Sequence, residues 1–594
     1  MTETELRKLV DQVRSGGLPR REAIHRLLGL GLSLPMAGLM LMEAGRAGAQ
    51  PSFTYKPTRR GGGGTLRLLE WQAPTSLNPH FATGLKDAFS SRIFYEPLAQ
   101  WDADGNLQPV LAAEIPSRDN GGISPDGRSV QWKLKRGVTW HDGQPFTADD
   151  VIFNWQYAID PAAATVTAGS YRNLKLEKVD THTVRVVFAA PAPFWPGQYS
   201  QVMLVPKHLF APFGGAKSRE SPNNNKPVGT AAYTFVDFKP GDLVHAALNP
   251  NYHQANRPHF DKLELKGGGD AASAARAVLQ TGEYDYAGSL VVEDDVLKRM
   301  EAAGKGRVQF LSGSATTAIY LNFTDPGTEV DGERSHAKTR HPVFSDARVR
   351  RAVGLLIDRQ SIETFVYGRL GVATANYINS PARYRSANTT SEFNIAKANA
   401  LLDGAGWRPG ADGIREKAGK KLTLLFQASI GAVTQKVQAV VKQAAQRAGI
   451  QLDLKAVAVS VFFSSDAGNS DTYGKFIADM QTYNWTNNSP DPEGLMQSFV
   501  SWEVASKANK WLSPNLVRWQ NSEFDALFRA AETELDPVKR AALFIQMNDL
   551  LVGDGYVLPI VDRTTARAMN QRLRAPLSGW DVDTASLPHW YRET

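Results

Sequence analysis

Strand-like and helix-like segments alternate along most of this 594-residue chain, and this alternation restricts its possible folds more than any other feature. Thr65–Glu70 has the partial alternation of apolar and polar residues that is typical of a strand. A helical period over residues 437–448 ends at Gly449, and residues 451–456 follow as a strand. Such a mixed order predicts an α/β architecture. The same patterns predict strands over 184–188, 476–483 and 556–561 and a helix over 543–551.

The composition narrows the class of protein. Apolar residues make up 42% of the chain and charged residues 21%, which excludes a mainly disordered chain and a polytopic membrane protein. Cysteine is absent, so thiol catalysis, disulfide scaffolds and thiolate metal sites are excluded. The net charge of +7 falls to +5 when residues 1–49 are left out, and no basic run is interleaved with aromatic residues. We therefore expect no nucleic-acid partner.

The N-terminal region has the pattern of an export signal. Residues 27–42 form an uncharged, largely apolar run that follows Arg20 and Arg21 and is too short for a comfortable membrane span. An A-x-A pattern, which signal peptidase accepts, ends at Ala49, directly before Gln50. The paired arginines resemble a twin-arginine signal, which exports folded proteins. A buried amphipathic helix is the alternative, but the run has no polar face of helical period.

We predict a signal peptide over residues 1–49, cleaved near Ala49 and Gln50, and a loose leader over residues 50–64. No cysteine follows the cleavage site, so a free protein is expected rather than a lipoprotein. No other stretch reaches eighteen apolar residues. These observations predict a periplasmic protein whose mature form is not inserted in the membrane.

Motifs for catalysis and metal binding are missing from the sequence. It contains no G-x-S-x-G elbow, no H-E-x-x-H, no P-loop and no G-x-G-x-x-G after a strand. The nearest histidine pairs, His253 with His259 and His336 with His341, lack metal-site spacing, so hydrogen-bonded or exposed histidines are expected. We therefore predict no catalytic residue, no metal and no cofactor. A secreted hydrolase stays a minor alternative, since it needs two close carboxylates that a sequence does not reveal.

Tryptophan is abundant, with thirteen residues, several of them beside turns. Rigid aromatic rings often line concave ligand sites, although burial in the core is the alternative for each one. The candidates beside turns are Trp71, Trp132, Trp140, Trp195, Trp485, Trp502 and Trp511.

Residues 132–154 read WKLKRGVTWHDGQPFTADDVIFN, an amphipathic strand, a turn at Gly143 and a helix that Thr147 can cap. This segment resembles the signature of the dipeptide/oligopeptide-binding family of ABC-transporter solute receptors. Other segments are similar to the family's motifs in the same order, and they cover nearly all of the mature chain: residues 64–79, 95–98, 109–112, 228–233, 249–252, 343–359, 396–407 and 524–559.

The resemblance implies a type II periplasmic binding protein of the large three-lobed form, with a hinge and an interlobe cleft. It also implies the periplasmic component of an ABC importer, a monomer that captures peptide-like ligands and delivers them to an inner-membrane permease. The lobes are expected as follows: lobe I from residues 65–95, 205–305 and 545–594, an inserted lobe II over 96–204, and lobe III over 306–544.

One loop of the family bears on the ligand. In dipeptide binders, a G-W-x-x-D-x-x-D-P loop carries an aspartate that pairs with the α-ammonium group of the peptide. Here the third position after Trp485 is Asn488, while Asp491 keeps the later Asp-Pro. An asparagine can accept a hydrogen bond from an ammonium group but lacks the charge that makes such pairs strong.

The second anchor of dipeptide binders, an arginine for the ligand carboxylate, also has no match, since the closest positions are Gln435 and Lys436. Two interpretations stay open: a peptide held by other anchors, or a polar non-peptide solute such as an opine or a sugar conjugate. The predicted ligand-binding residues are Ser76, Gln435, Lys436, Asn484, Trp485, Asn487, Asn488 and Asp491.

Overall fold

The computed structural model describes residues 56–593 except 71, 83, 172, 194, 465, 467, 487 and 488, together with residues 12, 22 and 26. The predicted signal peptide over residues 1–49 therefore lies almost wholly outside the described residues. The chain divides into two compact units. The terminal unit contains Pro51–Leu311 and Thr565–Thr594, and the middle unit contains Ser312–Thr564.

The terminal unit is built on a mixed sheet in the order β21-β10-β1-β9-β8-β7. Strand β1 pairs in parallel with β10 and β9, and the remaining pairs of this sheet are antiparallel. Leu66 and Leu68 point into the core with no exposed surface, which is the alternation that the sequence predicted. The strands are β1 (Thr65–Glu70), β7 (Tyr233–Lys239), β8 (Leu243–Leu248), β9 (Lys262–Gly267), β10 (Tyr286–Leu290) and β21 (Val557–Asn570).

A second, small sheet in the terminal unit packs against helix α5 (Ala148–Ile159). Its antiparallel order is β4 (Ser129–Lys133), β6 (Thr183–Phe188) and β5 (Leu174–Asp180). Thr147 caps α5, as the sequence predicted, and the structure adds a capping box with Asp150. The other elements of this unit are α4 (Gly84–Ser91), β2 (Ala99–Trp101), β3 (Leu107–Pro109), α6 (Lys207–Phe210), α7 (Ala271–Leu279), α8 (Asp294–Glu301), β22 (Leu573–Arg574) and β23 (Tyr591–Arg592).

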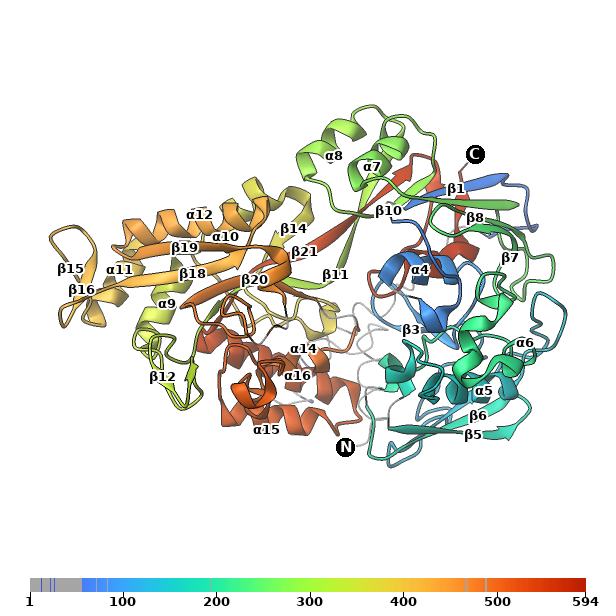
Figure 1. The fold of residues 1–594 in the computed structure, drawn as a ribbon, viewed down its shortest axis with the longest axis horizontal. Helices are drawn as coiled ribbons and strands as arrows, with labels where there is room; N and C mark the ends of the chain where they lie inside the picture. The colour runs from blue at the N-terminus through green and yellow to red at the C-terminus, as the bar shows by residue number, and fades with distance from the viewer. Residues whose placement is uncertain are drawn as a thin grey trace. The chain divides into compact units, whose positions relative to one another are not determined.

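The middle unit has its own strand order, β19-β18-β20-β11-β21, with β14 paired to β21. The strand β18 is parallel to both of its neighbours, whereas β20 is antiparallel to β11. Helix α12 lies along β18 and β19 (Figure 1). The bounds are β11 (Gly306–Leu321), β14 (Gly371–Ala373), β18 (Thr423–Ser429), α12 (Ala432–Arg447), β19 (Gln451–Val457) and β20 (Met480–Thr486).

Short helices and hairpins complete the middle unit. Helices α15 and α16 pack on each other, as do α9 and α11 (Figure 1). The bounds are β12 (Glu329–Val330), β13 (Glu333–Arg334), α9 (Ala347–Leu355), α10 (Arg359–Ile362), α11 (Ile395–Gly404), β15 (Arg408–Pro409), β16 (Arg415–Lys417), β17 (Lys420–Lys421), α13 (Val459–Phe462), α14 (Glu493–Met496), α15 (Ser522–Ala531) and α16 (Pro537–Asp554).

The predicted α/β architecture is confirmed, and several element ends differ from the prediction. Helix α16 starts earlier than expected, because Asp536 accepts hydrogen bonds from two backbone amides and Pro537 suits the first helical position. The strand expected over 476–483 begins only at Met480, since Phe476 has a φ of 42°, and it continues to Thr486.

The buried apolar residues form more clusters than there are units. Among the described residues, the terminal unit holds two hydrophobic clusters, one around β1, β8 and β9 and one around β4, β6 and α5. The middle unit holds one large cluster. The three-lobe division stays a prediction. In the described part of the chain, no helix is both long enough and apolar enough to cross a membrane.

Candidate functional site

The predicted ligand segment begins inside a strand rather than in a loop. Asn484 and Trp485 belong to β20 and lie opposite Thr317 and Thr316 of β11. Because side chains alternate along a strand, Tyr483 and Trp485 share one face and Asn484 lies on the other. Asn484 is exposed, whereas Trp485 is partly buried and packs against the hydrophobic cluster of the middle unit.

Trp485 lines a pocket of about 150 Å³ in the middle unit, which we call the aromatic pocket. A chain of rings leads into it: the Phe463 and Tyr473 centroids are 5.3 Å apart, and those of Tyr483 and Trp485 are 6.5 Å apart. Phe463 is 45% exposed, so part of this aromatic surface is open to a ligand. The pocket is lined by Phe463, Ser464, Asp466, Thr472, Tyr473, Gly474, Lys475, Trp485, Lys510, Trp511, Leu512, Ser513, Pro514 and Leu516.

Two lysines bring positive charge to this aromatic surface. The Lys475 ammonium lies 4.4 Å from the centre of the Trp511 ring, a cation–π contact. The Trp511 indole N–H donates to Glu333 Oε1 at 3.0 Å, which fixes the ring. Lys510 adds a second ammonium group to the lining. Rings beside cations suit an apolar side chain and a neighbouring carboxylate on one ligand.

Asp491 is held by an arginine of the same unit. The Arg540 guanidinium donates to Asp491 Oδ2 and, at 3.0 Å, to Glu493 Oε2. Asp491 Oδ1 accepts the Glu493 backbone N–H at 3.0 Å. Burial, and then the charge of Asp491, raise the pKa of Glu493 to about 8 although Arg540 opposes the shift. Both oxygens of Asp491 therefore serve to hold the chain that leads into α14.

The remaining predicted residues are spread over the structure. Gln435 and Lys436 are exposed near the first turn of α12 and do not line the aromatic pocket. Ser76 belongs to the terminal unit, where its Oγ accepts the Asn78 backbone N–H at 3.4 Å and its own N–H donates to Asp87. Asn487 and Asn488 lie outside the described residues.

The candidate tryptophans separate into core and surface. Trp132, Trp140 and Trp195 are buried in the terminal unit, at most 6% exposed, so burial in the core is the correct interpretation for them. Trp485 and Trp511 line the aromatic pocket. Of the other two, Trp502 is 43% exposed beneath the Arg529 guanidinium, and Trp71 lies outside the described residues.

Sequence reasoning did not find Phe463, Tyr473 or Lys475. Their segment is rich in Gly, Ser and Asp and indicates only a loop. One signal was present in Gly474, because a Cβ atom there would lie 2.9 Å from the backbone oxygen of Trp511. A glycine between two long side chains in such a loop indicates a close approach of another backbone.

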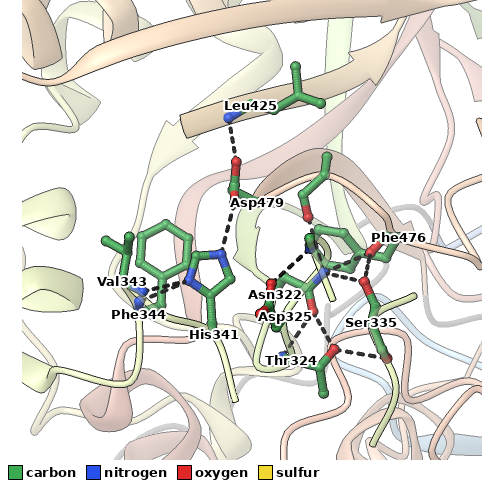
Figure 2. Close-up of polar contacts among 12 residues, drawn as sticks. Asn322, Thr324, Asp325, Ser335, His341, Val343, Phe344, Leu425, Phe476 and Asp479 are labelled. Carbon is green, nitrogen blue, oxygen red and sulfur yellow. Dashed lines mark hydrogen bonds and ion pairs between the residues drawn. The ribbon is translucent and has the colours of Figure 1, made fainter. Parts of the chain in front are cut away.

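Histidine does not form a metal site in the described part of the chain. His341 Nδ1 accepts the backbone N–H groups of Val343 and Phe344 at 3.1 and 3.0 Å, so the hydrogen lies on Nε2, which donates to Asp479 at 2.9 Å (Figure 2). Asp479 also accepts the Leu425 N–H at 2.6 Å. This histidine joins backbone segments, as expected for a hydrogen-bonded one. No group of three or more His, Cys, Asp or Glu among the described residues could hold a metal ion.

A family model described as bacterial extracellular solute-binding proteins, family 5 Middle, matches residues 106–507. The match covers more than half of the chain. The chain belongs to this family of solute-binding proteins. The predicted family and the predicted role in binding a solute are thereby confirmed, and the family is one of binding proteins rather than one defined by a reaction.

Relatives of this solute-binding protein align along most of its length. The oligopeptide-binding protein AppA of Bacillus subtilis is 25% identical over 487 residues, which are 80% of this chain and 81% of AppA. A protein of Brucella ovis that is named as an ABC transporter peptide-binding protein is 26% identical over 477 residues, 79% of this chain and 81% of the relative.

The solved structure of CtaP, an ABC transporter substrate-binding protein of Listeria monocytogenes, is similar with a TM-score of 0.70 and 22% identity. The structural alignment covers 89% of this chain and 99% of CtaP. This likeness confirms the predicted fold, that of a type II periplasmic binding protein.

Proposed function

We propose that this protein is the periplasmic solute-binding component of an ABC importer, and that it captures peptides and delivers them to an inner-membrane permease. The observation that carries the proposal is the alignment of about four-fifths of the chain with relatives that are named for peptide binding. The proposal includes export by the N-terminal signal and a free, monomeric mature protein. N-terminal sequencing of the periplasmic form checks the export step, and the sequence should begin at or near Gln50.

The aromatic pocket supports a peptide ligand. In our proposal, the Trp485 ring packs on a ligand side chain while Lys475 and Lys510 attract a carboxylate. Asn484 offers an exposed amide for a peptide group. Asp491 acts through Arg540 by holding the adjoining chain. The other proposed contacts, from the sequence alone, are Ser76, Gln435, Lys436, Asn487 and Asn488.

Calorimetric titration of the mature protein with peptides of two to nine residues tests the proposal. Opines and oligosaccharides form the comparison set. A ligand at 100 times its Kd should stabilise the protein by about 2.7 kcal/mol, so thermal shifts provide an independent readout. Binding of opines or oligosaccharides without any peptide binding would overturn the peptide proposal and favour the polar non-peptide alternative.

Trp485→Ala tests the site itself. If the ring packs on the ligand, the variant should lose about 1–3 kcal/mol of binding free energy with little loss of stability. Trp502→Ala is the matched control, since Trp502 is an exposed tryptophan of the same unit that does not line the aromatic pocket. A stability loss of about 3–5 kcal/mol with unchanged affinity would instead make Trp485 a core residue.

A further inference from the structure

A second pocket, in the terminal unit, is lined by basic side chains. We call it the basic pocket. It has a volume of about 500 Å³ and lies where β4 ends and β6 begins. Its cationic and imidazole groups come from Lys133, Lys135, Arg136, His182 and His253. No carboxylate is among its described lining residues, which are completed by small and apolar side chains and Thr183. The pocket is therefore suited to a ligand of negative charge.

Two of these cations interact with carboxylates through charge but without a hydrogen bond. Lys135 feels the charge of Glu96, and Arg136 that of Asp180. Lys133 donates to Glu114 at 2.9 Å and is thus paired. By contrast, the side chains of Lys135 and Arg136 make no hydrogen bond to any residue that the structure describes. Burial lowers the pKa of Lys135, and the charge of Glu96 opposes this shift only in part. A half-buried ammonium group without a bonded partner is stabilised by an anion that brings one.

His253 also lines the basic pocket. Its side chain is 6% exposed, and its Nε2 lies 2.9 Å from Glu96 Oε2. Glu96 is further held by the hydroxyl groups of Tyr252 and Thr230, at 2.9 and 3.0 Å. This carboxylate fixes the hydrogen of the imidazole on Nε2. His253 Nδ1 is buried and has no hydrogen-bond partner among the described residues.

The charges around Glu96 keep it ionised. Burial opposes the ionisation of Glu96, but the charge and hydrogen bond of His253, together with Arg92, outweigh it and lower the pKa to about 2. Arg257 brings a further positive charge to this region, since burial and then the charges of Arg257 and Lys135 lower the pKa of His589 to about 3. The lining itself therefore holds cationic but no anionic side chains, although Glu96 contacts His253.

We propose that the basic pocket binds an oxyanion, a phosphate or carboxylate group that lies between Lys135, Arg136 and His253. The guanidinium fork of Arg136 matches the geometry of two oxyanion oxygens, and Lys135 supplies a point charge. His253 lines the same pocket and is held there by Glu96. This site is separate from the residues of the proposed peptide function, and it gives the protein a second, anionic ligand.

Titration of the mature protein with inorganic phosphate, at constant ionic strength set by chloride, tests the inference. We expect saturable binding that weakens at least tenfold in the double variant K135Q/R136Q. Lys175→Gln is the matched control, since Lys175 is an exposed lysine of β5 outside the basic pocket. Its affinity for phosphate should stay within twofold of wild type. Absence of binding above the chloride background, or an equal loss in the control, would overturn the inference.

The source of the oxyanion is decided by two further arms. One uses malonate in place of phosphate, and the other uses vesicles of phosphatidylglycerol, with phosphatidylcholine vesicles as the reference. Vesicle association that K135Q/R136Q abolishes identifies a lipid headgroup, and phosphate or malonate binding without vesicle association identifies a free anion. Either result supports the site. Circular dichroism reports folding, and if the double variant is unfolded, Arg136→Gln alone takes its place, because Arg136 is exposed.

Discussion

Each unit places two carboxyl groups beside one arginine, and the two arginines distribute their hydrogen bonds differently. In the terminal unit, the Arg567 guanidinium donates to both oxygens of Asp583, at 3.1–3.3 Å. In the middle unit, the Arg540 guanidinium is shared between Asp491 and Glu493. One arginine thus serves a single carboxylate, and the other bridges two.

The second carboxyl group of the terminal unit is Glu70, the last residue of β1. Its Oε1 is buried without a hydrogen-bond partner among the described residues. Burial, and then the charge of Asp583, raise the pKa of Glu70 to about 8. The pKa of Glu493 is raised to about 8 as well, yet Glu493 keeps a contact with its arginine. A single guanidinium therefore stabilises one buried charge, and the second carboxyl group holds a proton instead.

This difference bears on the ligand site. Strand ends are the positions where α/β folds place ligand contacts. Asp491, which follows β20, has its charge compensated within the protein and supports the neighbouring chain. Glu70, which ends β1, has its pKa raised to about 8, which favours its protonated form at neutral pH. We therefore expect neither Asp491 nor Glu70 to form an ion pair with a ligand ammonium group.

Of the changes that test this comparison, Arg567→Met should have the largest effect on the unfolding free energy. The change leaves the buried Asp583 charge with only the Tyr286 hydroxyl, at 2.5 Å, as a compensating donor. Loss of one partner of a buried pair costs about 3–5 kcal/mol of unfolding free energy, which urea denaturation measures. Arg276→Met, at an exposed position of α7, is the control and should stay within about 0.5 kcal/mol. A loss below about 1 kcal/mol would show that Asp583 does not depend on Arg567.

Glu70→Gln should have the next largest effect, and it depends on pH. The folded state holds a proton on Glu70 up to a pKa of about 8, whereas the ordinary value is 4.5. The contribution of Glu70 to stability is therefore fully present below pH 4.5 and is lost as the pH rises to 8. The glutamine variant lacks this loss, so it should exceed wild type by roughly 2–4 kcal/mol at pH 8.5.

Unfolding free energies measured from pH 4.5 to 8.5 check this expectation. Wild type and Glu70→Gln should have similar unfolding free energies at pH 4.5, and the difference should grow as the pH rises. Glu220→Gln removes the same charge from an exposed position and should reproduce the wild-type pH profile. Parallel profiles for Glu70→Gln and wild type would mean that Glu70 is ionised in the folded protein.

Local patterns in the sequence predicted elements well and predicted contacts poorly. The alternation over Thr65–Glu70 gave the bounds of β1, and Thr147 marked the start of α5, because both signals act within a few residues. The Arg540–Asp491 pair joins positions 49 residues apart, and the Lys475 ammonium contacts Trp511, 36 residues further along the chain. Such pairs depend on the tertiary fold, so no local pattern reveals them.

Glu493→Gln should have the smallest effect on the unfolding free energy. It is the most direct test of the comparison between the two arginines. At pH 4.5 and below, Glu493 holds a proton in the folded and unfolded states alike, so glutamine resembles it, and the unfolding free energy should change by about 0.5 kcal/mol or less. Between pH 4.5 and 8 only the folded wild type keeps this proton, so the variant should become the more stable protein as the pH rises. Above pH 8 the variant should gain less stability than Glu70→Gln does, because the Glu493 side chain is 22% exposed and contacts Arg540. Asp491→Asn is the matched variant and should lose about 1–3 kcal/mol, since it removes the charge that Arg540 compensates. Equal losses in the two variants would mean that Arg540 divides its charge evenly between Asp491 and Glu493, and the contrast with the terminal unit would then rest on Glu70 alone.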